Sequence, residues 1–202
     1  MAGQKVVIID GGGANIASLR FALERLDADS ELTTDLDTIR NAERLILPGV
    51  GAAADAMQRL RAAGLDSVIP TLTQPLLGIC LGMQLLFDAS DEDDARCLGI
   101  IPGSATLFAA AQDRPVPHMG WNRVTAKQDS PLLAGIPDGS YFYFVHSYAL
   151  PVNDYTVGAA DYGREFTAVT SRNNFMGAQF HPERSGKLGA RLLQNFLQLK
   201  LN

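Results

Sequence analysis

The residues best suited to covalent chemistry lie in the segment 78–82, Gly-Ile-Cys-Leu-Gly. Cys80 stands where an apolar run passes into a helical pattern, and the flanking glycines match the nucleophile-elbow pattern G-x-Nuc-x-G. Such a turn needs glycines because a β-carbon at either position would collide with the neighbouring main chain. The start of a helix also favours a thiolate over a thiol, so Cys80 is a candidate nucleophile. The alternative, a plain buried cysteine, explains the apolar run but not the paired glycines.

A thiolate nucleophile usually works with a base, and His181 is the best placed of the three histidines. It follows a predicted strand, and Glu183 comes two residues later. Residues i and i+2 of an extended segment project to the same side, so we expect Glu183 to hold the imidazole, as in a catalytic triad. His118 lies in a Pro-rich segment and is predicted to be in a surface loop. His146, after an aromatic strand, fits a hydrogen-bonded histidine of the core.

An oxyanion formed at the nucleophile also requires hydrogen-bond donors. The backbone N–H of Leu81, directly after the nucleophile, is the first candidate. The Gly-rich turn 48–51, Pro-Gly-Val-Gly, is the second, since ligands of open parallel sheets bind beyond the strand ends. An ordinary strand-to-helix turn is the alternative for this segment. Cys97 lacks the glycines and the helix start, and no metal, nucleotide or other cofactor is predicted.

The elements that must position these residues alternate between strand and helix patterns in the first half of the chain. Strands are expected at 5–9, 30–34, 44–47 and 76–80, the third broken by Pro48-Gly49. Helices are expected after Asn15, at 53–63 and from Leu81 onward. This alternation is typical of an α/β fold with a mainly parallel central sheet flanked by helices on both faces.

The second half of the chain is richer in strands. Segments 141–145, 156–160, 166–170 and 176–180 are separated by short turns, which predicts additional antiparallel strands on the same sheet. A last helix is expected at 187–199. The acidic run 88–94 is expected to be a solvated loop. Because there is no internal repeat and no long linker, residues 1–202 are predicted to form a single domain.

Composition excludes several classes of protein. The 202 residues include 17 Lys and Arg against 22 Asp and Glu, and the resulting net charge of −5 argues against nucleic acid as a partner. A hydrophobic content of 47% excludes disorder. The most apolar stretch, 75–87, is shorter than the roughly 20 residues that span a membrane. With no signal-peptide core at 1–13, a cytoplasmic location is expected.

Two segments, 78–84 (GICLGMQ) and 180–185 (FHPERS), resemble the class I, or triad, glutamine amidotransferases. Segments 48–51 (PGVG), 117–122 (PHMGWN) and 143–148 (YFVHSY) are similar to one branch, the glutaminase subunits of imidazole glycerol phosphate synthase in histidine biosynthesis. The likeness covers residues from about 4 to 200. It implies the single-domain class I glutamine amidotransferase fold.

The resemblance implies an enzyme that hydrolyses glutamine to glutamate and ammonia through a thioester on Cys80. It assigns the two oxyanion donors to the amides of Leu81 and Val50. His181 protonates the departing ammonia and then activates water, while Glu183 orients the imidazole. The implied substrate contacts are Gly49, Gly51, Gln84, Ser147, Tyr148 and an acidic residue after the elbow helix, here Glu92, which would bind the α-ammonium group.

The resemblance also implies a heterodimer with a (β/α)8-barrel cyclase subunit, HisF. The cyclase receives ammonia through an internal channel and forms imidazole glycerol phosphate and aminoimidazole carboxamide ribonucleotide. It further implies that the 48–51 peptide flips when the partner binds its substrate. Many relatives have Tyr and Met where this chain has Gly11 and Gly13, and Lys in place of Arg184, so the interface contacts differ in detail. The implied interface residues are Asn15, His118, Met119, Trp121, Tyr143 and Arg184.

Three other functions remain open. The first is an amidotransferase subunit of another pathway, of the anthranilate or aminodeoxychorismate type, which would differ only in its partner. The second is a stand-alone cysteine γ-glutamyl hydrolase, which would be fully active without a partner. The third is a non-catalytic binding module on the same fold, since fold does not determine function.

Overall fold

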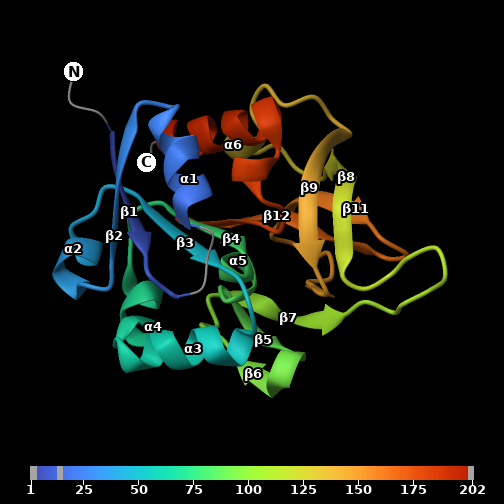
Figure 1. Ribbon diagram of the computed structural model, residues 1–202, viewed down its shortest axis with the longest axis horizontal. Coiled ribbons are helices and arrows are strands. Elements are labelled where there is room, and N and C mark those ends of the chain that lie inside the picture. The colour runs from blue at the N-terminus through green and yellow to red at the C-terminus, as the bar shows by residue number, and fades with distance from the viewer. Residues whose placement is uncertain (1–3, 13–15, 200–202) are drawn as a thin grey trace.

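A nine-stranded sheet runs through the molecule, with helices on both of its faces (Figure 1). The computed structural model describes residues 4–12 and 16–199. Strand order in the sheet is β2-β1-β3-β4-β13-β12-β11-β8-β9. The strands from β2 to β13 pair in parallel and the remainder pair antiparallel, which confirms the predicted fold class. Their bounds are β1 (Gln4–Ile9), β2 (Ala28–Thr33), β3 (Leu45–Gly49), β4 (Leu76–Cys80), β8 (His118–Ala126), β9 (Ser140–His146), β11 (Thr156–Asp161), β12 (Glu165–Arg172) and β13 (Phe175–Ala178).

Two hydrophobic cores lie on opposite faces of the sheet. Val6 and Ile8 of β1 belong to one core, whereas Val7 and Ile9 belong to the other, because successive side chains of a strand alternate. A strand covered on both faces reads as a continuous apolar run. Helices α1 (Ile16–Glu24) and α6 (Gly186–Gln198) cover the first face, and α3 (Ala53–Ala62) and α4 (Leu65–Val68) cover the second.

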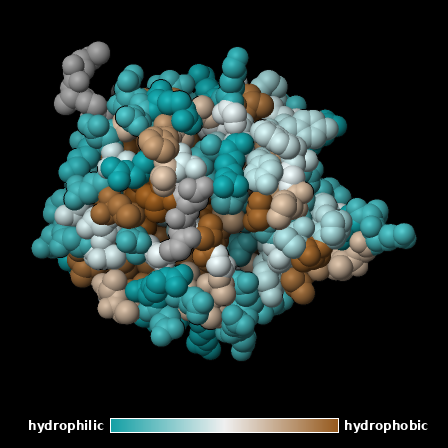
Figure 2. Space-filling model, viewed as in Figure 1, coloured by the Kyte–Doolittle hydropathy of each residue, from teal (hydrophilic) through white to brown (hydrophobic). Residues whose placement is uncertain are grey.

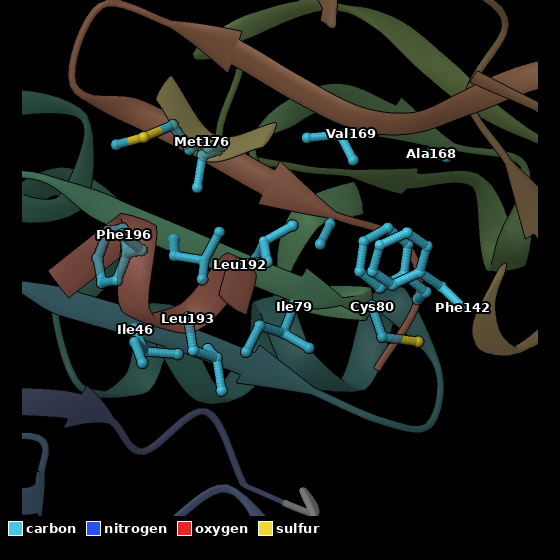
Figure 3. Packing of buried hydrophobic residues seen from close by; sticks show 14 of the residues in the cluster. Ile46, Ile79, Cys80, Phe142, Ala168, Val169, Met176, Leu192, Leu193 and Phe196 are labelled. Atoms are coloured by element: carbon cyan, nitrogen blue, oxygen red, sulfur yellow. The ribbon is translucent and has the colours of Figure 1, made fainter. Parts of the chain in front are cut away.

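Figure 3 shows how the first core is filled. Leu192, Leu193 and Phe196 of α6 lie over Ile46 of β3 and Ile79 of β4. The 3.6-residue period of the last helix brings all three side chains to the sheet. The strand that carries Cys80 is therefore held against a packed layer.

A second, four-stranded sheet was not predicted. Its order is β10-β7-β5-β6, and it begins directly after the short helix α5 (Leu81–Gln84). The helix expected from Leu81 lasts one turn because Phe87, fully buried, already starts a strand. Residues 88–90 of the acidic run 88–94 lie in that strand, so the predicted loop was wrong there, whereas 91–94 lie outside the strands. The bounds are β5 (Phe87–Ser90), β6 (Ala95–Arg96), β7 (Ile101–Leu107) and β10 (Tyr148–Ala149).

Strand β3 also differs from the expectation, since it continues through Pro48 and Gly49. Both residues pair with β4, whereas pairing with β1 has already ended at Ile46. The missing N–H of the proline therefore breaks no bond to β1. The short helices outside the sheet layers are α2 (Leu36–Arg40) and the 3-10 turns η1 (Ile69–Thr71), η2 (Glu92–Asp94), η3 (Pro131–Leu133) and η4 (Pro182–Arg184).

The surface is mostly hydrophilic on the face shown in Figure 2, where apolar residues gather in separate patches. Within the part of the chain that the structure describes, no helix is long and apolar enough to cross a membrane.

Candidate active site

Cys80 sits at a strained turn between β4 and α5. Its φ of 54° and ψ of −113° are unusual for a residue with a side chain, and such a conformation costs of order 1–3 kcal/mol. A β-carbon on Gly78 would lie 2.6 Å from the carbonyl oxygen of Gly82, and one on Gly82 would overlap the carbonyl oxygen of Leu47. The two glycines are thus required by close main-chain packing, as the elbow pattern predicted.

His181 and Glu183 are in direct contact. The ring Nδ1 lies 2.8 Å from Glu183 Oε1, and the glutamate side chain is 5% exposed. The predicted contact is present, but its predicted route through an extended segment was wrong. Only His181 is extended, and Pro182–Arg184 form the 3-10 turn η4, which folds the carboxylate back onto the ring.

The charge of His181 is set by its two neighbours. Burial acts to lower the pKa of the imidazole, but Cys80 and Glu183 outweigh it and raise that pKa to about 10. The ring is therefore protonated at neutral pH. An imidazolium between a sulfur and a carboxylate is the arrangement expected of a nucleophile, a base and an orienting group.

A cavity of about 260 Å³ brings most of the predicted site residues together. It is open at the Cys80 thiol and large enough for a small amino acid. Gly49 is not among the residues that line it, although it pairs with Cys80 across the β3–β4 ladder. The residues that line the cavity are Val50, Gly51, Cys80, Leu81, Gln84, Glu92, Pro117, Val145, His146, Ser147, Tyr148 and His181.

Two polar side chains of the cavity are fixed by hydrogen bonds. The Ala53 amide, at the start of α3, donates to Glu92 Oε2 over 2.9 Å. Gln84 Nε2 donates to the carbonyl oxygen of Tyr148 over 3.0 Å and to Gln179 Oε1 over 2.9 Å. Because both amide hydrogens of Gln84 are used, a ligand can meet only its oxygen.

His118 is not in a surface loop, so that prediction was wrong. It begins β8, is 3% exposed, and stacks on the ring of Tyr162 at 4.1 Å. Its Nδ1 lies 2.9 Å from Nε2 of His146, whose Nδ1 donates to the Tyr148 carbonyl over 2.7 Å. Burial lowers the pKa of His118 to about 4 and that of His146 to about 3. Both are therefore neutral core histidines, as expected for His146 alone.

The remaining interface candidates lie near the edge of the large sheet. Met119 and Trp121 are 62% and 56% exposed on the outer side of β8. Tyr143 of β9 pairs with Trp121, and the two rings meet edge to face at 6.0 Å. Arg184 is exposed in η4. Asn15 lies outside the described residues.

Reasoning from the sequence missed Gln179. It is fully buried, and its Nε2 approaches the sulfur of Cys80 to 3.9 Å. A signal was present, because Gln179 stands two residues before His181 at a strand end, where both side chains project to one side.

Cys80 and Cys97 are both free thiols, and Cys97 lies outside this cavity. Burial, reinforced by Asp88 and opposed by Arg61, raises the pKa of the Cys97 thiol to about 11, which leaves it unreactive. Among residues 4–12 and 16–199, no cluster of three His, Cys, Asp or Glu side chains could hold a metal ion.

Comparison with known proteins gives a consistent result. The family model "Glutamine amidotransferase class-I" matches residues 7–199. Imidazole glycerol phosphate synthase subunit HisH 1 of Vibrio vulnificus is 50% identical, and the alignment covers 98% of this chain and all of the relative. Subunit HisH of Xanthomonas axonopodis pv. citri is 53% identical over 96% of this chain and 97% of the relative.

Solved structures of lower sequence identity share the fold. A glutamine amidotransferase crystal structure superposes with a TM-score of 0.74 at 16% identity, covering 96% of this chain and 97% of the other. PurLQS from Thermotoga maritima gives a TM-score of 0.72 at 17% identity, covering 96% and 98%. The chain therefore belongs to the class-I glutamine amidotransferase family and, within it, to the group of the HisH subunits.

Proposed function

We propose that this chain is the glutaminase subunit of an imidazole glycerol phosphate synthase in histidine biosynthesis. It hydrolyses glutamine to glutamate and ammonia and passes the ammonia to a cyclase subunit. The observation that carries this proposal is the full-length likeness to HisH proteins, combined with Cys80 and His181 facing one cavity. The glutaminase activity itself follows from the family to which the chain belongs.

The proposed reaction begins with attack of the Cys80 sulfur on the side-chain carbonyl carbon of glutamine. The amides of Leu81 and Val50 stabilise the oxyanion that forms. His181 donates its proton to the departing ammonia, which leaves a thioester on the sulfur. The neutral ring then takes a proton from water, whose oxygen attacks the thioester and releases glutamate. Glu183 holds the ring at Nδ1 throughout, consistent with the 2.8 Å contact.

Glutamine is proposed to lie across the 260 Å³ cavity with its amide at Cys80. Glu92 supplies the negative charge that its α-ammonium group requires, while Gln84 presents an acceptor oxygen. Gly51 lines the cavity with open space where a side chain would stand, so its main chain can come close to the substrate. Gly49 lets the turn pack closely on Leu81 and Gly82 of the elbow. Ser147 and Tyr148 also line this cavity.

The partner is proposed to be the (β/α)8 cyclase, HisF, bound at the outer face of β8 and β9. This face carries Met119, Trp121 and Tyr143, and large exposed apolar side chains of this kind mark interaction sites. Val145 of β9 lines the catalytic cavity, so the face borders the place where ammonia is released. Arg184 is an exposed cation in η4, the turn that follows His181. Because His118 is buried, it could affect the cyclase only through the side chains that cover it.

Glutamate release from glutamine tests this function. The purified chain is assayed alone, with the cyclase subunit, and with the cyclase and its nucleotide ligand, with Cys80→Ala as the control. Low activity alone and strong activation in the liganded complex are expected. Full activity that the cyclase does not change would identify a stand-alone γ-glutamyl hydrolase. Activation only by an anthranilate or aminodeoxychorismate synthase partner would place the chain in another pathway. No activity in any state would leave a binding module.

A further inference from the structure

Gln179 connects the nucleophile to the substrate cavity. It lies between β13 and His181, is fully buried, and touches both Cys80 and Gln84. A buried carboxamide with both ends engaged in this way is costly to place unless its hydrogen bonds are satisfied. The mechanism described above gives it no role.

The polarity of this hydrogen-bond chain is fixed at one end by the main chain. The carbonyl oxygen of Tyr148 can only accept, so Gln84 must turn its NH2 group toward it. The second hydrogen of that group then points to Gln179, which must present its oxygen at 2.9 Å. Gln179 is left with its own NH2 group facing the sulfur of Cys80 at 3.9 Å. Reversing any one amide would set two donors or two acceptors against each other.

Two other groups near the Cys80 sulfur do not act as neutral hydrogen-bond donors to it. Val145 offers only a carbonyl oxygen, at 3.7 Å from Sγ, which is an acceptor for a thiol but repels a thiolate. His181 approaches from the cavity as a cation. Gln179 is thus a neutral donor that contacts the sulfur from within the core.

We propose that Gln179 is a positioning residue of this site: its side-chain N–H holds the Cys80 sulfur as a thiolate, and its oxygen locks the Gln84 carboxamide with the oxygen toward the substrate. The proposal deepens the proposed function, since it assigns a residue to the same reaction. The same donor assists thioester hydrolysis, in which the sulfur leaves with a negative charge. Gln179 itself neither reacts with glutamine nor transfers a proton.

Alkylation of Cys80 by iodoacetamide across a range of pH measures this effect without glutamine or the cyclase. Gln179→Met removes the donor without adding charge, and Gln179→Glu replaces it with an acceptor. Gln74→Met is the matched control, because Gln74 Nε2 is also a hydrogen-bond donor, but to the main-chain carbonyl oxygens of Ile39 and Arg40 and not to the sulfur. All variants carry Cys97→Ser, so that one thiol is followed.

The expected result is a shift of the alkylation profile to higher pH. Loss of one hydrogen bond to a thiolate should raise the midpoint in Gln179→Met by about half a pH unit and lower the rate on the acid side of the midpoint roughly threefold. Gln179→Glu should shift it further, and Gln74→Met should match the parent. Glu92, His146, Tyr148 and His181, the titratable side chains that share the cavity, stay unchanged in every variant.

A Gln179→Met profile that coincides with that of the parent would overturn the proposal. If neither Gln179 variant folds, the side-chain amide resonances of the Cys97→Ser chain decide instead. The Gln179 N–H signals should move with the titration of Cys80, whereas an unmoved signal would overturn the proposal. A chain that alkylates as expected but releases no glutamate with any partner would refute the proposed function alone.

Discussion

Glu92 has one role in the structure and one proposed role in substrate binding, and substitution can separate them. Its carboxylate accepts the Ala53 N–H at the start of α3, where the N-cap residue Ala52 makes no side-chain hydrogen bond. The same carboxylate lines the catalytic cavity, where it is proposed to bind the α-ammonium group of glutamine. Glu92→Ala removes both roles, whereas Glu92→Gln keeps an acceptor oxygen for the helix and removes only the charge.

The structural role sets the expected loss of stability. Deleting the side chain that caps a helix N-terminus costs about 1 kcal/mol. For a chain of this length, about 1 kcal/mol lowers the melting temperature by roughly 2–4 °C. We expect that fall in Glu92→Ala, and less than half of it in Glu92→Gln.

The binding role sets the expected change in kinetics. A hydrogen bond to a charged group contributes about 1.5–3 kcal/mol, which corresponds to roughly a 10- to 150-fold rise in KM for glutamine. The α-ammonium group is remote from the amide that reacts, so the same interaction exists in the ground state and the transition state. Such a loss raises KM and leaves kcat nearly unchanged.

Steady-state glutaminase assays of the liganded complex and thermal unfolding of the isolated chain provide the two measurements. Asp94→Asn, an exposed neighbour in η2, controls for the loss of one negative charge. An unchanged KM in Glu92→Gln would refute the substrate role and leave Glu92 as a helix cap. Equal melting temperatures for Glu92→Ala and the parent would refute the capping role.

Three further predictions follow from the same geometry. Cys80→Ala should abolish glutamate release while circular dichroism shows a melting temperature within about 3 °C of the parent, since little core volume is lost; a larger fall would favour a structural cysteine. Gly82→Ala should lower the free energy of unfolding in urea by about 3 kcal/mol or more, because its β-carbon overlaps the main chain. Gly51→Ala, with φ +90° and open space, should fold and alter substrate-stimulated turnover more than basal turnover. Equal stabilities of the two variants would contradict the elbow geometry. Burial lowers the pKa of His118 to about 4 and that of His146 to about 3, against 6.5 in the unfolded chain. The unfolded chain therefore binds more protons as pH falls from 6.5 toward 4, and the fold loses stability. Urea unfolding should give a lower free energy of unfolding at pH 5 than at pH 7, and equal values would contradict this.

Local patterns predicted the parts of the site that depend on a few adjacent residues. The glycines around Cys80 indicated the elbow because their requirement is steric and short-range. The pairing of His181 with Glu183 was also predicted, although a 3-10 turn and not an extended segment produces it. Proline at the start of such a turn is common, so residues 182–184 carried a signal for it.

Features that depend on distant partners were not predictable in the same way. The small sheet forms only because β7 pairs with both β5 and β10, and its strands are short and weakly patterned. His118 is buried because its strand pairs with β9 and its ring stacks on Tyr162, which no local pattern around two prolines reveals. The position of Gln179, two residues before His181, was a local signal, but its contact with Gln84, far earlier in the chain, was not predictable from local patterns.

The register between β4 and β13 has a consequence for how such a chain can change over time. Cys80, the proposed nucleophile, ends one strand, and His181, the proposed base, follows its immediate neighbour, with Ile79 opposite Ala178. Everything from α5 to the start of β13 is an excursion of the chain between these two neighbouring strands, and it includes the small sheet as well as β8, β9, β11 and β12 of the large one. Insertions or exchanges within the excursion can reshape the substrate wall and the partner face without separating sulfur from imidazole. One pair of strands thus preserves the chemistry while the recognition surfaces evolve.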